Sequence, residues 1–231
     1  MRHDPPRERD QPTPVIEGYP NTARRTPAAK LLRRPLPRLL TAGAAPAMPL
    51  ASIDMAEPVP GKPAMGSRIM VQLRVVDEDG RGVPDAVVEI WHANAAGRYD
   101  HPADPARAPL DHHFRGAARV ATDRNGRLAL HTIKPGAYPV PDSGQWWRPA
   151  HIHFSVLGRG AVTRLVTQMY FAGDPMLEWD RIWLSVPDAR ARARMVATQL
   201  PPHEAPITTD IERLVFTHTL VLRGREETPP A

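Results

Sequence analysis

Short runs of apolar and β-branched residues, separated by turn signals, fill the chain from residue 68 onward. Runs of this kind predict β-strands rather than helices. A hairpin is expected where the Asp123 to Gly126 turn joins the strands Arg119 to Thr122 and Arg127 to Ile133. Many short strands with spaced turns predict an all-β fold, an antiparallel β-sandwich. The other strands expected are Arg68 to Val76, Ala86 to Trp91, Ala150 to Leu157, Arg164 to Phe171 and Ile211 to Arg223.

Three segments depart from this strand pattern. Asp188 to Leu200 (DARARARMVATQL) is rich in helix-forming residues and follows a proline, so it predicts the fold's one short helix. Two connections, Ala93 to Ala118 and Lys134 to Pro149, are long for a compact β domain. Long ordered loops of this kind usually carry function, so we expect these two to contribute functional residues.

Residues 1–65 have no sustained periodicity and are rich in proline, arginine and alanine, which predicts an extended N-terminal arm before a domain at 66–231. Residues 1–62 hold ten Lys or Arg against six Asp or Glu, which is four of the chain's five net positive charges. The arm lacks the interleaved aromatic residues of a nucleic-acid surface. We therefore expect it to lie on a partner chain, with no nucleic acid involved.

The sequence has no cysteine, which excludes disulfides and thiolate metal sites. A metal ion would need His, Tyr, Asp or Glu ligands. The absence of cysteine suits a cytoplasmic protein, and no apolar run is long enough to cross a membrane. The stretch RRPLPRLLTAGAAPAMPLA weakly resembles a twin-arginine export signal, but its prolines and its distance from Met1 argue against that interpretation.

One predicted strand carries two histidines in the sequence RPAHIHFSV. Residues two apart on a strand point to the same face, so His151 and His153 would project together, opposite Ile152. Such a pair can bind one metal ion. The plainer alternative is one buried, hydrogen-bonded histidine and one exposed histidine, and the pair alone does not decide between them.

The two long loops each contain a tyrosine, and these tyrosines make the pattern more specific. Tyr99 lies in NAAGRYDHP and Tyr138 in KPGAYPVP, two of only four tyrosines in the chain. A phenol has a pKa near 10, so only a strongly charged metal holds it ionised at neutral pH. Fe(III) is such a metal, whereas Zn(II) rarely takes two tyrosines.

Five motifs together resemble those of the intradiol ring-cleavage dioxygenases, in particular the iron-bearing β chains of that family. They are NAAGRY, TIKPGAYP, WRPAHIHF, LVTQMYFAGDP and VLRG, within residues 66–224. The resemblance implies that O2 cleaves the ring of protocatechuate or a related catechol between its two hydroxylated carbons. The product would be a (carboxy-)cis,cis-muconate. The resemblance also implies an α subunit of similar fold in an αβ hetero-oligomer.

The same resemblance assigns roles to individual residues. It implies that Fe(III) is held by Tyr99, Tyr138, His151 and His153, and that Tyr138 also serves as a base for the substrate. Arg148, always cationic, would stabilise negative charge on the substrate ring. The implied substrate-pocket residues are Trp91, Gln168, Tyr170, Ile182 and, from the arm, Tyr19.

One position departs from the family pattern, and two other functions stay open. The motif around Tyr138 usually reads Tyr-Pro-Trp, and here Val140 replaces the tryptophan, which leaves the exact catechol undetermined. The stretch VVDEDGRGVPDAVVEI also resembles transthyretin-like and carboxypeptidase-regulatory-like modules, which bind without catalysis. A third possibility is an Fe(II) or Zn(II) enzyme that uses the histidine pair with a carboxylate such as Asp100. We interpret His112 and His113 as part of a solvated loop.

Overall fold

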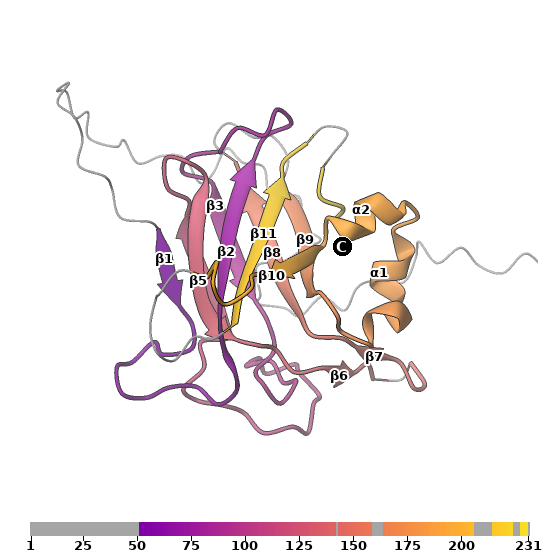
Figure 1. Cartoon of the computed structure of the whole chain (residues 1–231). Coiled ribbons are helices and arrows are strands. Elements are labelled where there is room, and N and C mark those ends of the chain that lie inside the picture. Colours follow the sequence, from indigo (N-terminus) through magenta and orange to yellow (C-terminus); the bar gives the residue numbers. More distant parts are fainter. Residues whose placement is uncertain (1–50, 142, 159–163, 206–213, 224–226, 231) are drawn as a thin grey trace, which may run out of the picture.

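The structure is a computed structural model that describes residues 51–141, 143–158, 164–205, 214–223 and 227–230. Tyr19 lies outside these residues. The described chain is mostly β, as predicted (Figure 1). Its strands are β1 (Ser52–Asp54), β2 (Arg68–Val76), β3 (Val87–Trp91), β4 (Ala117–Ala121), β5 (Arg127–Ile133), β6 (Tyr138–Pro139), β7 (Trp147–Arg148), β8 (His151–Leu157), β9 (Leu165–Phe171), β10 (Val196–Gln199) and β11 (Leu214–Val221). Its helices are the 3-10 turn η3 (Leu177–Trp179), α1 (Arg181–Ser185) and α2 (Ala189–Ala193).

Nine strands form one sheet in the order β1-β5-β2-β11-β10-β9-β8-β3-β4, and β6 and β7 form a separate small hairpin (Figure 1). The prediction of a purely antiparallel arrangement is wrong, because the sheet is mixed. The pairs β1–β5, β9–β10 and β2–β11 are parallel. An alternation of apolar and polar residues fixes which face is buried, but it does not encode the direction of the neighbouring strand.

The two halves of this sheet face a common core. Alternate residues of β8, Ile152, Phe154 and Val156, have no exposed surface and belong to the same buried cluster as Phe216 and Leu220 of β11. Each such side chain contributes about 1.5–3 kcal/mol on burial. The strand β10 pairs with β11 in one half and with β9 in the other. The sheet is therefore continuous through β10, and the sandwich arrangement predicted from the sequence is not confirmed.

The predicted turn at Asp123 forms, but the predicted hairpin does not. The Gly126 N–H donates to the Asp123 carbonyl (3.0 Å), and the Asp123 N–H donates to the Arg127 carbonyl (2.9 Å). Beyond the turn, however, β4 pairs with β3 while β5 pairs with β2. The turn thus carries the chain from one half of the sheet to the other, which a local sequence signal does not distinguish from a hairpin.

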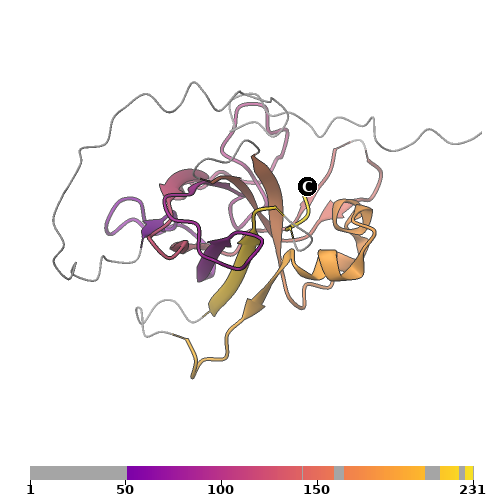
Figure 2. The ribbon, with the colours of Figure 1, turned by 90° about the horizontal axis from the view of Figure 1, so that it is seen from above.

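The predicted helix over Asp188 to Leu200 is shorter in the structure. The Asp188 side chain accepts a hydrogen bond from the Arg190 N–H and caps α2, which ends at Ala193. The chain then enters β10, because the sheet offers hydrogen-bond partners on both sides there. A second short helix, α1, lies beside α2 on the same side of the strands and was not predicted (Figure 2). No helix in the described ranges is long and apolar enough to span a membrane.

Residues 51–65, which the sequence analysis assigned to the arm, pack on the domain. The strand β1 pairs in parallel with β5, and Met55 and Ala56 are fully buried in the main core. The Ala64 N–H donates to the Ala56 carbonyl (2.7 Å) and closes the loop that follows. The packed core therefore includes residues before the expected boundary at Gly66, because the few apolar residues there, Met55, Ala56 and Ala64, form no periodic pattern.

A buried histidine in β11 predicts a loss of stability in acid. His218 points into the core beside the Phe154 ring, and burial lowers its pKa to about 4. The unfolded chain takes up this proton near pH 6.5, so stability falls as the pH drops from 6.5 to 4, by about 2 kcal/mol at pH 5. Urea unfolding of His218→Phe at pH 7.5 and 5.0 should show a correspondingly smaller pH effect. The exposed-site control His203→Gln should keep the wild-type difference, and equal pH effects in all three proteins would contradict the prediction.

Candidate metal centre

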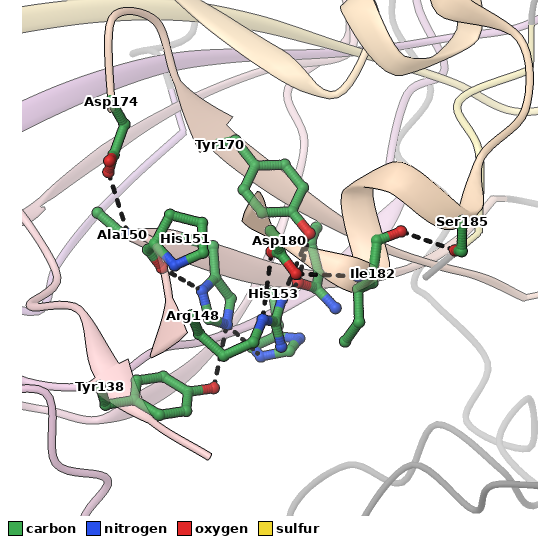
Figure 3. Close-up of polar contacts among 12 residues, drawn as sticks. Tyr138, Arg148, Ala150, His151, His153, Tyr170, Asp174, Asp180, Ile182 and Ser185 are labelled. Carbon is green, nitrogen blue, oxygen red and sulfur yellow. Dashed lines mark hydrogen bonds and ion pairs between the residues drawn. The ribbon is translucent and has the colours of Figure 1, made fainter. Parts of the chain in front are cut away.

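Four side chains that are distant in sequence bring their donor atoms together. Tyr99 Oη lies 3.4 Å from Tyr138 Oη and 3.5 Å from His151 Nε2. His153 Nε2 lies 3.2 Å from both Tyr99 Oη and His151 Nε2, and Tyr138 Oη lies 3.3 Å from His151 Nε2. Figure 3 shows Tyr138, His151 and His153 converging from β6 and β8. The two oxygens and two nitrogens thus surround a single point, and we call these residues the tyrosine–histidine cluster.

The spacing of the cluster suits one metal ion. A first-row ion bound about 2.0–2.2 Å from each donor separates neighbouring donors by about 2.8–3.8 Å when they lie 90–120° apart. The measured separations of 3.2–3.5 Å fall in this range. Two oxygen and two imidazole donors without any sulfur form a set that suits a hard, highly charged ion.

The strand β8 sets the directions of both histidines. Ile152 and Phe154 point into the main core, so His151 and His153 point to the opposite face, as the alternation predicted. His151 Nδ1 lies 2.7 Å from the Pro149 carbonyl oxygen, to which it donates. This contact leaves Nε2 unprotonated and free to bind a metal. The His153 ring stacks on Trp91, with centroids 4.9 Å apart and planes within 2°.

Two glycines allow the tyrosine loops to touch. A Cβ on Gly97 would lie 2.4 Å from the Ala137 carbonyl oxygen, and one on Gly136 would lie 2.3 Å from the Ala95 carbonyl oxygen. Gly97 also has a φ of +79°, which favours glycine. Since Gly97 is two residues before Tyr99, and Gly136 two before Tyr138, this close backbone contact sets the distance between the two phenols.

Burial favours the neutral forms of His151, His153 and Tyr138. Desolvation, together with the nearby Arg148 guanidinium, lowers the pKa of His151 and of His153 well below the usual value. Desolvation raises the pKa of Tyr138, and the positive charge of Arg148 offsets this only in part. The imidazoles therefore offer free lone pairs, while the phenols require a cation to become ionised.

Arg148 is buried beside the cluster and engaged by three side chains. Its Nε donates to Asp180 Oδ2 (3.2 Å), and its Nη2 donates to Tyr170 Oη (3.3 Å) and to Gln168 Oε1. Tyr170 Oη in turn donates to Gln168 Oε1 (3.1 Å). Figure 3 shows Arg148 between His151 and the Tyr170–Asp180 group. The guanidinium is thus fixed, and a fixed charge can act on a nearby ligand.

The remaining predicted residues lie as follows. Gln168 is opposite His153, and Tyr170 opposite His151, across the β8–β9 pairing. Trp91 is opposite His153 across β3–β8. Ile182 lies on α1 beside the Arg148 group, where its N–H donates to Asp180 Oδ1 (2.9 Å; Figure 3).

The other histidine-rich segment and the carboxylate alternative find no support in the structure. His112 and His113 are exposed. Among the residues that the structure describes, no three His, Asp or Glu side chains are placed to hold a metal ion. This arrangement therefore does not support an Fe(II) or Zn(II) site made of the histidine pair and Asp100.

Three contributors to the site were missed in the sequence. Asp180 pairs with Arg148, the Pro149 carbonyl orients His151, and the contact of Gly97 and Gly136 positions the phenols. A buried acidic residue directly before a short apolar helix (EWDRIW) is a helix-capping signal that could have drawn attention to Asp180. The other two depend on backbone atoms, which residue types do not reveal.

Comparisons with known proteins identify relatives of this chain. A family model described as a dioxygenase matches residues 48–224. A protocatechuate 3,4-dioxygenase beta chain of Burkholderia cepacia is 48% identical over 169 residues, 73% of this chain and 69% of that protein. A catechol 1,2-dioxygenase of Acinetobacter baylyi is 34% identical over 148 residues, 59% of this chain and 45% of that protein. The crystal structure of Acinetobacter radioresistens catechol 1,2 dioxygenase superposes with a TM-score of 0.57 at 25% identity, covering 78% of this chain and 59% of that one.

Proposed function

Since the chain belongs to the intradiol dioxygenase family, we propose that it is an Fe(III) enzyme that cleaves protocatechuate or a related catechol with O2. Cleavage falls between the two hydroxylated carbons, both oxygen atoms enter the product, and a (carboxy-)cis,cis-muconate results. The observation that carries the proposal is the convergence of Tyr99, Tyr138, His151 and His153 within 3.2–3.5 Å. A non-catalytic binding module would not explain why these two phenols and two imidazoles converge.

The cluster would hold Fe(III) through two phenolate oxygens and two imidazole nitrogens. When bound, Fe(III) supplies the positive charge that keeps a deprotonated catechol in place and permits its reaction with O2. The chain's own residues supply the other requirements. Tyr138 Oη, on a hairpin at the edge of the cluster, is the base that accepts a proton from the substrate diol.

Arg148 would stabilise the negative charge that develops on the substrate ring. Its guanidinium stays cationic at every physiological pH, and its burial beside the cluster strengthens its electrostatic effect. Gln168 and Tyr170 hold it in place, and Trp91 holds the His153 ring. Trp91, Gln168, Tyr170 and Ile182 are the proposed substrate-pocket residues of the described chain, and Tyr19 of the arm is a further proposed contact.

The substrate and the partner follow from the relatives. The Burkholderia cepacia relative is a beta chain named for protocatechuate, so we assign protocatechuate as the first substrate to test and an α subunit as the expected partner. Val140, across the β6–β7 hairpin from Trp146, is the position that distinguishes this pocket from the family pattern. The partner-binding role of the N-terminal arm and the cytoplasmic location stay predictions.

The colour of the protein tests the proposal. Fe(III) bound by phenolates absorbs visible light, so the iron-loaded protein should be wine-red with a high-spin ferric electron paramagnetic resonance signal. Anaerobic reduction should bleach it, and catechols should shift its absorption. Oxygen uptake with protocatechuate, catechol and hydroxyquinol, with and without an α subunit, identifies the substrate. An iron-loaded but colourless protein that consumes no O2 under any of these conditions would sink the proposal.

A further inference from the structure

The ion pair between Arg148 and Asp180 is buried at both ends. Arg148 is 5% exposed and Asp180 is fully buried. Arg148 Nε donates to Asp180 Oδ2 at 3.2 Å. A buried guanidinium and a buried carboxylate each need a partner, because either charge alone is costly to remove from water. Asp180 therefore provides the negative charge that allows Arg148 to remain buried beside a site that itself has to bind a cation.

Asp180 also joins two elements through its two carboxylate oxygens. Oδ1 accepts from the Ile182 N–H (2.9 Å) and caps α1, while Oδ2 accepts from Arg148 on β7. A second contact lies next to it: the centre of the Trp146 ring lies 5.9 Å from the guanidinium of Arg148 and 5.2 Å from that of Arg181. The hairpin that carries Tyr138 and Arg148 is thus fastened to the start of α1.

The contacts of Arg148 engage two of its three nitrogens. Nε donates to Asp180, and Nη2 donates to Gln168 and Tyr170. Among the described residues none accepts a hydrogen bond from Nη1. A planar guanidinium held at two positions has a fixed orientation, which also fixes the direction of the third nitrogen.

We propose that Asp180 is a positioning residue that orients Arg148 so that Nη1 remains the donor for the substrate. Asp180 does not touch the reacting atoms; it acts through Arg148. This inference rests on the proposed function, since it gives Arg148 a role on the bound catechol. Without the Asp180 charge the guanidinium would lose one of its two fixed positions, and misplacements of about 1 Å can cost about a hundredfold in rate.

Asp180→Asn tests the proposal, because asparagine still caps a helix but carries no charge. In the iron-loaded protein with its α subunit we expect kcat to fall about 10- to 100-fold, with iron content and visible absorption unchanged. The matched control is Asp188→Asn, which alters the equivalent cap of α2 at an exposed residue that makes no hydrogen bond to Arg148, and which should leave kcat within about twofold. Unchanged kcat in Asp180→Asn, or an equal fall in both variants, would overturn the proposal.

A double-mutant cycle with Arg148→Met separates positioning from general damage. If Asp180 acts through Arg148, adding Asp180→Asn to Arg148→Met should lower kcat no further. In urea unfolding, Asp180→Asn should destabilise the wild type more than it destabilises Arg148→Met. Equal, additive effects in both backgrounds would refute the inference. The unfolding cycle needs no turnover, so it tests the pair even if the wild type cleaves no catechol, a result that would count against the proposed function alone.

Discussion

His153→Ala is expected to lose its iron and at least about a thousandfold of its ring-cleavage rate. His153 Nε2 lies 3.2 Å from both Tyr99 Oη and His151 Nε2, so its removal opens the cluster on the side that Trp91 covers. Three remaining donors would bind Fe(III) more weakly, and the phenols would return to their neutral form. Iron content after gel filtration, visible absorption and oxygen uptake measure the three losses separately.

The control for this variant is His113→Ala, which removes an exposed histidine from the loop between β3 and β4. It should keep iron, colour and turnover. Tyr99→Phe offers an independent check, because it removes one phenolate and should shift or abolish the visible band. A red, fully active His153→Ala protein would remove this residue from the metal centre and with it the ligand set proposed above.

Arg148→Lys is expected to keep its iron and colour while kcat falls about a hundredfold. Lysine keeps the positive charge, but its single nitrogen cannot engage Asp180, Gln168 and Tyr170 and still face the substrate. The variant therefore separates charge from orientation. Steady-state kinetics with protocatechuate and titration of the visible band with substrate under anaerobic conditions measure turnover and binding.

The control for Arg148→Lys is the same arginine-to-lysine exchange at a surface position. Arg190 is exposed on α2, so Arg190→Lys should turn over like the wild type. If Arg148→Lys also matched the wild type, charge alone would suffice and the oriented guanidinium would have no role. Loss of iron from Arg148→Lys would instead mean that the residue supports the cluster rather than the substrate.

The sequence predicts the site well where strand periodicity determines side-chain direction. The two-residue repeat places Ile152 in the core, and this alone requires His151 and His153 to share the other face. The positions of Tyr99 and Tyr138 were predictable only in part. Their loops could be recognised by length and by glycine, but their convergence depends on a backbone contact between Gly97 and Gly136 that forms only in the folded chain.

The fold is less predictable where long-range pairing decides. The turn at Asp123 has the residues of a hairpin turn, yet β4 pairs with β3 while β5 pairs with β2. The segment after Ala193 has helix-forming residues, yet it forms β10 between β9 and β11. In both cases hydrogen bonding between distant strands overrides a local preference, and a single sequence does not reveal which strands will pair.

The parallel pairing of β2 with β11 has a consequence for synthesis of the chain. These strands come from opposite ends of the described domain, and all eight residues of β11, from Leu214 to Val221, are in register with β2. During translation, β2 cannot pair with β11 until almost the whole polypeptide has left the ribosome. Domains that depend on pairing between such distant strands fold slowly, and the edge of the earlier strand stays unpaired until the later strand arrives. Ribosome-stalled chains that end before β11 should therefore remain sensitive to protease and depend on chaperones.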